Sequence, residues 1–314
     1  MKKSRSLLYF MIISLAALLL SSCVRSPSND NSGSGGSGGG KNPTEGIEYA
    51  VSSDGTCAIV IGYEGSAQNV VIANEYNGVP VARIGNNAFA NNKSLRSVTL
   101  PDSLLVIGDG AFSGCEWLDY ITLPDTVKEF GEGAFKNCKL IEGFYVPSAL
   151  ETVGESAFEG CINLEWLSVK SIDGWLNIDF ANATANPLYY GDELYLVDLP
   201  VASIEIGNGV SAIHDYALSF SSLKYLTVTG ADIDLQRGVL ADCKNLVELS
   251  IPSLGKSGEG KGFLGYLFGA ESNAQNSAFI PTSLKTVTLT GASSVEEGAF
   301  LGASSLVGVN LSSA

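Results

Sequence analysis

A hydrophobic pattern with a fixed period of 23 residues runs from Val81 to Val169. Its unit is one apolar residue, an Ala-Phe pair that begins four residues later, and then a segment spaced as apolar-x-x-apolar-x-apolar. The pairs are Ala88-Phe89, Ala111-Phe112, Ala134-Phe135 and Ala157-Phe158. A short fixed period is typical of a solenoid, in which each repeat buries its apolar side against its neighbours. Residues 81–170 are therefore predicted to form regular 23-residue repeats.

Each repeat is expected to contribute one β-strand and one short turn. The predicted strands are Leu95-x-x-Val98-x-Leu100, Leu118-x-x-Ile121-x-Leu123, Ile141-x-x-Phe144-x-Val146 and Leu164-x-x-Leu167-x-Val169. Their last two apolar residues are two positions apart, so both point to the inner face of a sheet. The Ala-Phe pair is predicted to lie in a single helical turn, where each Phe stacks on its counterpart one repeat away.

The segments around these repeats depart from the period to different degrees. Residues 47–80 alternate apolar and polar positions around two hairpin-type turns, Asp54-Gly55 and Asn77-Gly78, and are predicted to form an N-terminal β cap. The remaining predicted segments are an expanded irregular repeat (171–212), degenerate repeats in which Ala-Phe becomes Ala-Leu or Val-Leu (213–252), an excursion (253–283) and a last repeat (284–314). The aromatic-rich segment 171–212 is expected to stay in the stack, because such a segment is rarely a free loop.

The first 22 residues have the features of an export signal. Lys2, Lys3 and Arg5 precede a short apolar run, and this run ends in Leu20-Ser21-Ser22-Cys23. That ending resembles the lipobox of bacterial lipoproteins, which implies that Cys23 receives a diacylglycerol anchor. An uncleaved membrane anchor is the alternative, but the run is short for the ~30 Å of a bilayer core. Residues 23–46 are then the lipidated Cys and a Gly/Ser-rich flexible tether.

The net charge of the chain limits which classes of macromolecule it is expected to bind. The 314-residue chain carries 33 acidic and 18 basic residues, for a net charge of −15. A nucleic-acid-binding surface needs clustered Lys and Arg, so a nucleic-acid partner is not expected.

Residues with reactive side chains do not form a catalytic constellation. Four cysteines occupy one slot of the repeats: Cys115, Cys138, Cys161 and Cys243. That slot also takes Asn92 and Ala303, which favours buried free thiols, while the strand spacing leaves disulfides open. The single histidine, His214, occupies a turn position, and the loop Gly255–Gly262 resembles a phosphate-binding loop but lacks its hydroxyl residue. No catalytic residue, metal site or cofactor is therefore expected.

Two outward slots of the predicted strands hold the candidate ligand face. The candidate residues are Tyr120, Tyr145, Trp166, Tyr225, Thr99, Thr122 and Thr227, with Ser168 among the small polar residues of the second slot. Ordinary strand propensity explains Thr and Tyr at such positions, and a binding surface explains them equally well, because exposed aromatic rings are typical interface anchors.

The repeat resembles that of the BspA-like leucine-rich repeat family of bacterial surface proteins. The resemblance is carried by Ile107-x-x-x-Ala111-Phe112-x-x-Cys115-x-x-Leu118-x-x-Ile121-x-Leu123-Pro124 and its copies, and covers about Ile47 to Leu311. It implies a right-handed solenoid with a parallel β-sheet, short helical turns and an N-terminal β cap. It also implies an exported lipoprotein of a Gram-negative bacterium, anchored in the outer membrane and exposed at the cell surface.

Two hypotheses of function follow from these observations. The first is a non-enzymatic, surface-anchored adhesion protein that recognises a host or neighbouring-cell macromolecule through the sheet face. The alternative is a glycan-capturing accessory lipoprotein of a surface polysaccharide-uptake system. The expected partners are a protein or glycan ligand at the cell surface and the membrane, through a lipid anchor on Cys23.

Overall fold

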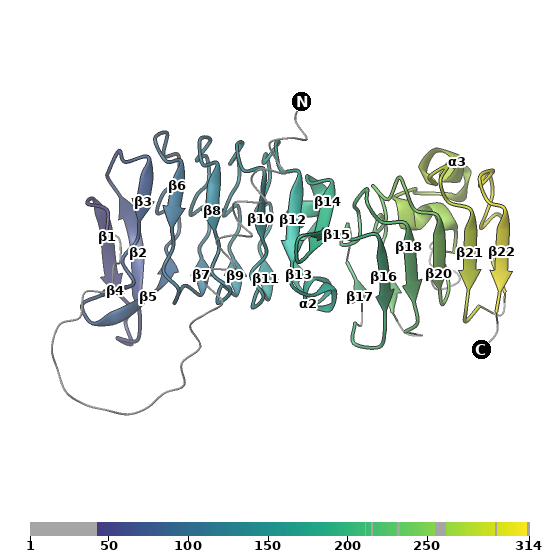
Figure 1. Ribbon diagram of the computed structural model, residues 1–314, viewed down its shortest axis with the longest axis horizontal. Coiled ribbons are helices and arrows are strands. Elements are labelled where there is room, and N and C mark those ends of the chain that lie inside the picture. The colour runs from purple at the N-terminus through teal and green to yellow at the C-terminus, as the bar shows by residue number, and fades with distance from the viewer. Residues whose placement is uncertain are drawn as a thin grey trace. The chain divides into compact units, whose positions relative to one another are not determined.

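The computed structural model describes residues 43–210, 212–214, 216–230, 233–254, 262–292 and 294–312. The predicted export signal, Cys23 and nearly all of the predicted tether lie outside these residues, as does the Gly-Lys loop up to Lys261. The described residues form a parallel-sheet solenoid of about 10 turns (Figure 1). The predicted fold class is confirmed.

The regular turns of the solenoid contribute strands to two separate ladders. One ladder contains β1 (Ile47–Val51), β2 (Ala58–Tyr63), β5 (Val79–Ile84), β7 (Val106–Ile107), β9 (Glu129–Phe130), β11 (Thr152–Val153) and β13 (Asp179–Phe180). All its pairs are parallel except β1 with β2, which closes the N-terminal end as an antiparallel cap. β4 (Glu75–Tyr76) adds an antiparallel pair to β5, and β17 (Ala212–Ile213) pairs in parallel with β19 (Asp234–Leu235).

The second side of the solenoid carries the strands predicted from the apolar spacing, and we call it the strand face. Its hydrogen-bonded pairing is interrupted twice, which gives three groups of strands. The first group is β3 (Asn69–Val71), β6 (Ser97–Thr99) and β8 (Tyr120–Thr122). The second is β10 (Gly143–Tyr145), β12 (Trp166–Val169), β14 (Glu193–Leu196) and β15 (Leu199–Pro200), and the third is β16 (Ser203–Ile206), β18 (Tyr225–Val228), β20 (Glu248–Ile251), β21 (Thr286–Leu289) and β22 (Gly308–Leu311).

The Ala-Phe segments form runs of turns closed by bonds from N–H groups to carbonyls three residues earlier, as from Ala111 to Gly108 (3.1 Å). A further bond joins each segment to the next turn of the solenoid: the Phe112 N–H donates to the Ala134 carbonyl at 2.8 Å. The residue before each Ala has positive φ, for example 58° at Gly110 and 57° at Asn87. Gly and Asn tolerate this left-handed conformation best, which explains why they recur at that slot.

The Phe side chains form a continuous stack in the core, as predicted. Ring centroids are 5.2 Å apart for Phe89 and Phe112, 5.6 Å for Phe112 and Phe135, and 5.5 Å for Phe135 and Phe158, with interplanar angles of 8–11°. Each buried Phe contributes roughly 1.5–3 kcal/mol through removal of apolar surface from water. The stack is therefore a principal stabilising feature of the regular repeats.

The repeat cysteines are free and buried, which agrees with the thiol interpretation. Each Sγ donates to a main-chain carbonyl of the preceding turn: Cys115 to Phe89 (3.0 Å), Cys138 to Phe112 (3.2 Å), Cys161 to Phe135 (3.2 Å) and Cys243 to Leu218 (2.9 Å). Burial raises the pKa of the Cys161 thiol to about 12. The slot therefore holds a small, neutral side chain with one weak donor.

The segment 171–212 stays in the stack. It contains α2 (Ile172–Leu176), the short 3-10 helices η1 (Ala183–Ala185) and η2 (Pro187–Tyr189), and the strands β13 to β16. The Trp175 side chain is buried, and its Nε1 donates to the Ala217 carbonyl at 2.7 Å. This bond joins the enlarged repeat to the next Ala-Leu turn.

The second irregular segment also supplies a turn of the solenoid. It contains η3 (Leu264–Phe268), η4 (Asn273–Gln275) and α3 (Asn276–Phe279). The Leu240 N–H donates to the Leu267 carbonyl (2.8 Å), and the Leu264 N–H donates to the Ala299 carbonyl (2.9 Å), so η3 lies between two regular turns. The strand β21 that follows was not assigned from the sequence, although Leu284-x-x-Val287-x-Leu289 has the strand spacing.

Candidate functional site

The candidate aromatic residues lie on the outer side of the strand face. Tyr120, Trp166 and Tyr225 begin strands β8, β12 and β18, and Tyr145 ends β10. The neighbouring inward residues, such as Ile121 and Phe144, are buried in the core. Tyr120 is 39% exposed and Tyr225 is 45% exposed, whereas Tyr145 and Trp166 are half-buried.

Tyr145 and Trp166 form the centre of this surface. Their ring centroids are 5.7 Å apart at an interplanar angle of 73°, an edge-to-face arrangement. The indole lies over Gly143, its partner in the ladder, because a Cβ on Gly143 would be only 2.2 Å from Trp166 Cδ2. The absence of a side chain at Gly143 therefore provides the space that the indole occupies.

The Tyr145 hydroxyl connects the aromatic centre to an acidic hairpin. It donates to Asp198 Oδ1 at 3.0 Å. Partial burial, together with the Asp198 carboxylate, raises the pKa of Tyr145. The hydroxyl therefore remains a neutral donor over the physiological pH range.

Tyr195 belongs to the same surface and was missed as a candidate residue. It lies in β14, and the ladder register places Ser168 between Tyr145 and Tyr195. Its hydroxyl donates to Glu193, and burial with this carboxylate raises the pKa of Tyr195. The spacing of Leu194 and Leu196 could have revealed its outward position. We call Tyr120, Tyr145, Trp166 and Tyr195 the aromatic face.

The polar candidates differ in accessibility. Thr99 and Thr122 are exposed, and Thr122 Oγ1 donates to the Tyr120 hydroxyl at 3.0 Å. Thr227 is half-buried in β18. Ser168 lies on the outward side of the strand, as expected, but it is only 1% exposed, so it is not accessible as a polar surface residue. The reason is its position between two tyrosines in the ladder.

Tyr225 stands apart from the aromatic face. It lies in the third group of strands, in register with Ser203 of β16 and Glu248 of β20. Among the described residues no ring contact joins it to Tyr145, Trp166 or Tyr195. The strand face therefore carries one aromatic cluster and one separate tyrosine.

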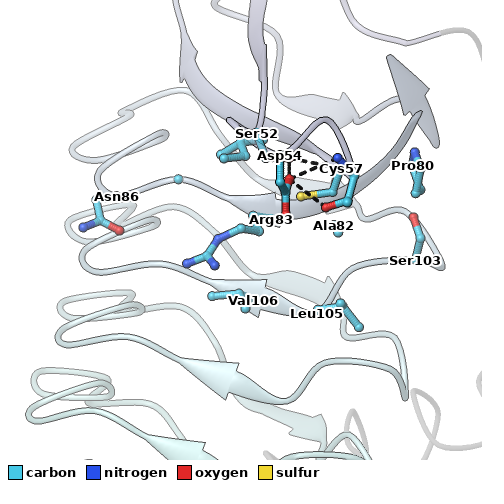
Figure 2. Close-up of a pocket in the computed structure, with 13 residues that line it drawn as sticks. Ser52, Asp54, Cys57, Pro80, Ala82, Arg83, Asn86, Ser103, Leu105 and Val106 are labelled. Atoms are coloured by element: carbon cyan, nitrogen blue, oxygen red, sulfur yellow. Dashed lines mark hydrogen bonds between the residues drawn. The ribbon is translucent and has the colours of Figure 1, made fainter. Parts of the chain in front are cut away.

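A hollow of about 680 Å³ lies on the other ladder, near the N-terminal cap (Figure 2). The β1–β2 turn, which contains Asp54 and Cys57, lies on one side of it, and Arg83 of β5 lies near its centre. Hydrogen bonds from Ser52 and Thr56 lower the pKa of Asp54 to about 2, so this carboxylate is ionised and organises the turn. The lining of the hollow therefore includes apolar and uncharged polar residues, one carboxylate and one guanidinium group.

The remaining candidates for chemistry are the single histidine and groups of side chains that could hold a metal ion. His214 is half-buried beside Phe180, Asn182 and Gln236, and the described residues that line that small hollow include no serine or cysteine. Within the described ranges, no group of three His, Cys, Asp or Glu side chains is arranged to hold a metal ion. None of the helices in the described part of the chain has the length and apolar character needed to cross a membrane.

The family described as "BspA type Leucine rich repeat region" matches the chain in 6 copies, over residues 66–183 and 197–263. No curated protein matches the chain.

Among solved structures, a leucine-rich repeat protein of T. pallidum is 23% identical over 66% of this chain and 91% of its own, with a TM-score of 0.48. A leucine-rich cell surface protein of Faecalibacterium prausnitzii is 16% identical over 87% of this chain and 95% of its own, with a TM-score of 0.34. The pneumococcal vaccine antigen PcpA is 16% identical over 80% of this chain and 82% of its own, with a TM-score of 0.35.

Proposed function

Because the chain belongs to the BspA-type leucine-rich repeat family, we propose that it is a non-enzymatic binding protein of the cell surface. Its ligand is a macromolecule of a host or of a neighbouring cell, and the aromatic face is the surface that recognises it. The proposal agrees with the family, whose solenoids are typically non-enzymatic. In this proposal the predicted export signal directs secretion, and the lipid anchor on Cys23 holds the protein at the outer membrane.

The arrangement of Trp166 is the observation that carries the proposal. An indole that lies over Gly143, with the Tyr145 ring at its edge, is a rigid apolar surface framed by hydroxyl and carboxylate groups. Rigid aromatic rings bring large contact area to an interface at low cost in conformational entropy. The carboxylates of Asp198 and Glu193 favour a neutral or basic ligand.

A glycan is the second candidate ligand, and the indole of Trp166 is also suited to bind it. The flat face of an indole packs against apolar C–H groups, while Asp198, Glu193 and the tyrosine hydroxyls offer hydrogen-bond partners for sugar hydroxyls. Under this second proposal the protein is an accessory of polysaccharide capture.

The experiment compares one set of variants against two sets of ligands. The purified protein is applied to a glycan array and to a panel of host matrix proteins, and its binding is compared with that of Trp166→Ala. A central anchor contributes about 2 kcal/mol or more, so binding should weaken by about thirtyfold. Trp117→Ala is the matched control, because Trp117 is 47% exposed outside the aromatic face.

Each outcome discriminates between the proposals. Loss of glycan binding in Trp166→Ala alone supports polysaccharide capture, and loss of matrix-protein binding supports adhesion. Equal binding by both tryptophan variants, to every ligand that the wild type recognises, would contradict a role for the aromatic face. A hydrolase activity that disappears in His214→Ala would contradict the non-enzymatic assignment.

A further inference from the structure

The strand face contains an open strand edge in the middle of the solenoid. After β14 the chain reverses at Val197 and Asp198, whose φ angles are 46° and 67°, and β15 returns antiparallel to β14. The next strand, β16, pairs in parallel with β18. No ladder joins β15 to β16 among the described residues, so the pairing of the strand face ends at β15 and starts again at β16 (Figure 1).

The outer edge of β15 is protected against pairing. Leu199 pairs with Leu196, and the Val201 N–H donates to the Leu194 carbonyl at 2.9 Å, so both residues face β14. Pro200 lies between them and faces the other way. Proline has no N–H group, and a proline at this position is a known means of blunting a sheet edge.

The edge of β16 has no such protection. The Ala202 carbonyl accepts from the Tyr225 N–H at 3.1 Å, and the Ile206 carbonyl accepts from the Thr229 N–H at 2.8 Å. Backbone groups alternate in direction along a parallel strand, so Ser203 and Glu205 point their N–H and C=O groups away from β18. Both residues are exposed, and within the described residues these backbone groups bond to no other strand.

The surroundings of this edge suit a peptide. Val197 is 62% exposed and Leu199 is 71% exposed on the hairpin, and Tyr225 lies beside Ser203 on β18. The Glu205 side chain is exposed on the same strand. Apolar side chains on either side of an acidic strand complement an extended peptide that is neutral or basic.

We propose that the edge of β16 accepts an extended peptide segment of a partner protein as an added strand. The alternating donors and acceptors of Ser203 and Glu205 match the backbone of a strand, and pairing them removes two unpaired amide groups. The hairpin at Val197 and Asp198 adjoins both this edge and the aromatic face, but the edge of β16 uses other backbone groups, so the proposal does not depend on the function proposed above.

The first measurement is amide hydrogen exchange of the free protein. The N–H groups of Ser203 and Glu205 should exchange quickly, and those of Ile204 and Ile206 should be protected by their bonds to β18. Protection of all four amides would show that another segment already covers the edge, and would overturn the proposal.

The second measurement uses a defined probe, an octapeptide of alternating threonine and valine with a lysine at each end. Its matched control is the same peptide with N-methyl groups on alternate residues, which removes the donors of one edge. The unmodified peptide should slow exchange at Ser203 and Glu205, and the methylated peptide should bind about tenfold more weakly or worse, because it loses backbone hydrogen bonds. Equal binding of the two peptides, or no binding of either, would refute strand addition.

A variant separates this site from the rest of the protein. Glu205→Pro removes an outward N–H and keeps the bonds of Ile204 and Ile206 to β18, so peptide binding should fall about tenfold. Glu205→Thr keeps the N–H and should retain binding. If Glu205→Pro does not fold, the comparison of the unmodified and N-methylated peptides on the wild-type protein still tests strand addition. Peptide binding unchanged in Trp166→Ala would show that the two sites are independent.

Discussion

Truncation of the core phenylalanines should reveal a gradient of stability along the stack. Phe135 is fully buried and has three ring neighbours: Phe112 and Phe158 stack on it, and Phe130 meets it edge-to-face at 5.4 Å. Phe112 has two ring neighbours, Phe89 and Phe135. At the other extreme, Phe300 is only half-buried, and no ring contact is seen for it among the described residues.

The expected losses follow from these environments. Phe→Ala in a packed core costs about 3–5 kcal/mol, since the vacated volume is only partly refilled. Each aromatic contact adds about 0.5–1.5 kcal/mol, so Phe135→Ala should lie about 1 kcal/mol above Phe112→Ala in the free energy of unfolding lost. Phe300→Ala should cost roughly 2 kcal/mol, in proportion to its smaller buried area.

Urea unfolding followed by circular dichroism measures these losses as shifts in the transition midpoint. Phe135→Leu serves as the control, because it keeps an apolar side chain in the stack and should lose less than Phe135→Ala. Equal losses at Phe135, Phe112 and Phe300 would refute the reasoning, since it derives each loss from burial and ring contacts at that position.

Three further outcomes are expected. Cys23→Ala should move the protein from the membrane fraction to the soluble fraction, and continued membrane association would contradict the lipid anchor. The pKa of the Cys161 thiol is about 12 in the folded protein and about 8.5 in an unfolded chain. The contribution of this thiol to the free energy of unfolding is therefore intact below pH ~8.5 and falls by about 1.4 kcal/mol per pH unit as the pH rises towards 12. Between pH 7 and pH 10, urea unfolding should therefore show a smaller loss of stability for Cys161→Ser than for the wild type. Gly143→Val should displace the Trp166 ring and weaken ligand binding as Trp166→Ala does, whereas ligand binding at wild-type strength would show that the ring position is not needed.

The core could be predicted from the sequence because a solenoid repeats one set of neighbour contacts. The 23-residue period aligns Phe89, Phe112, Phe135 and Phe158, and the structure stacks them at 5.2–5.6 Å. The outward direction of Tyr120 and Trp166 followed in the same way, because alternate residues of a strand point to opposite faces. Buried free thiols followed from the small residues that share their slot.

The candidate binding surfaces could not be predicted in full, because they depend on contacts that the 23-residue repeat does not specify. Tyr195 joins the aromatic face because β14 pairs with β12, although the intervening segment has no 23-residue repeat. Trp175 connects that segment to Ala217, a residue distant in the sequence. The hairpin at Val197 and Asp198 then separates two ladders and leaves the edge of β16 open. A periodic pattern specifies contacts between equivalent positions of neighbouring repeats, whereas the placement of an irregular insertion depends on long-range packing.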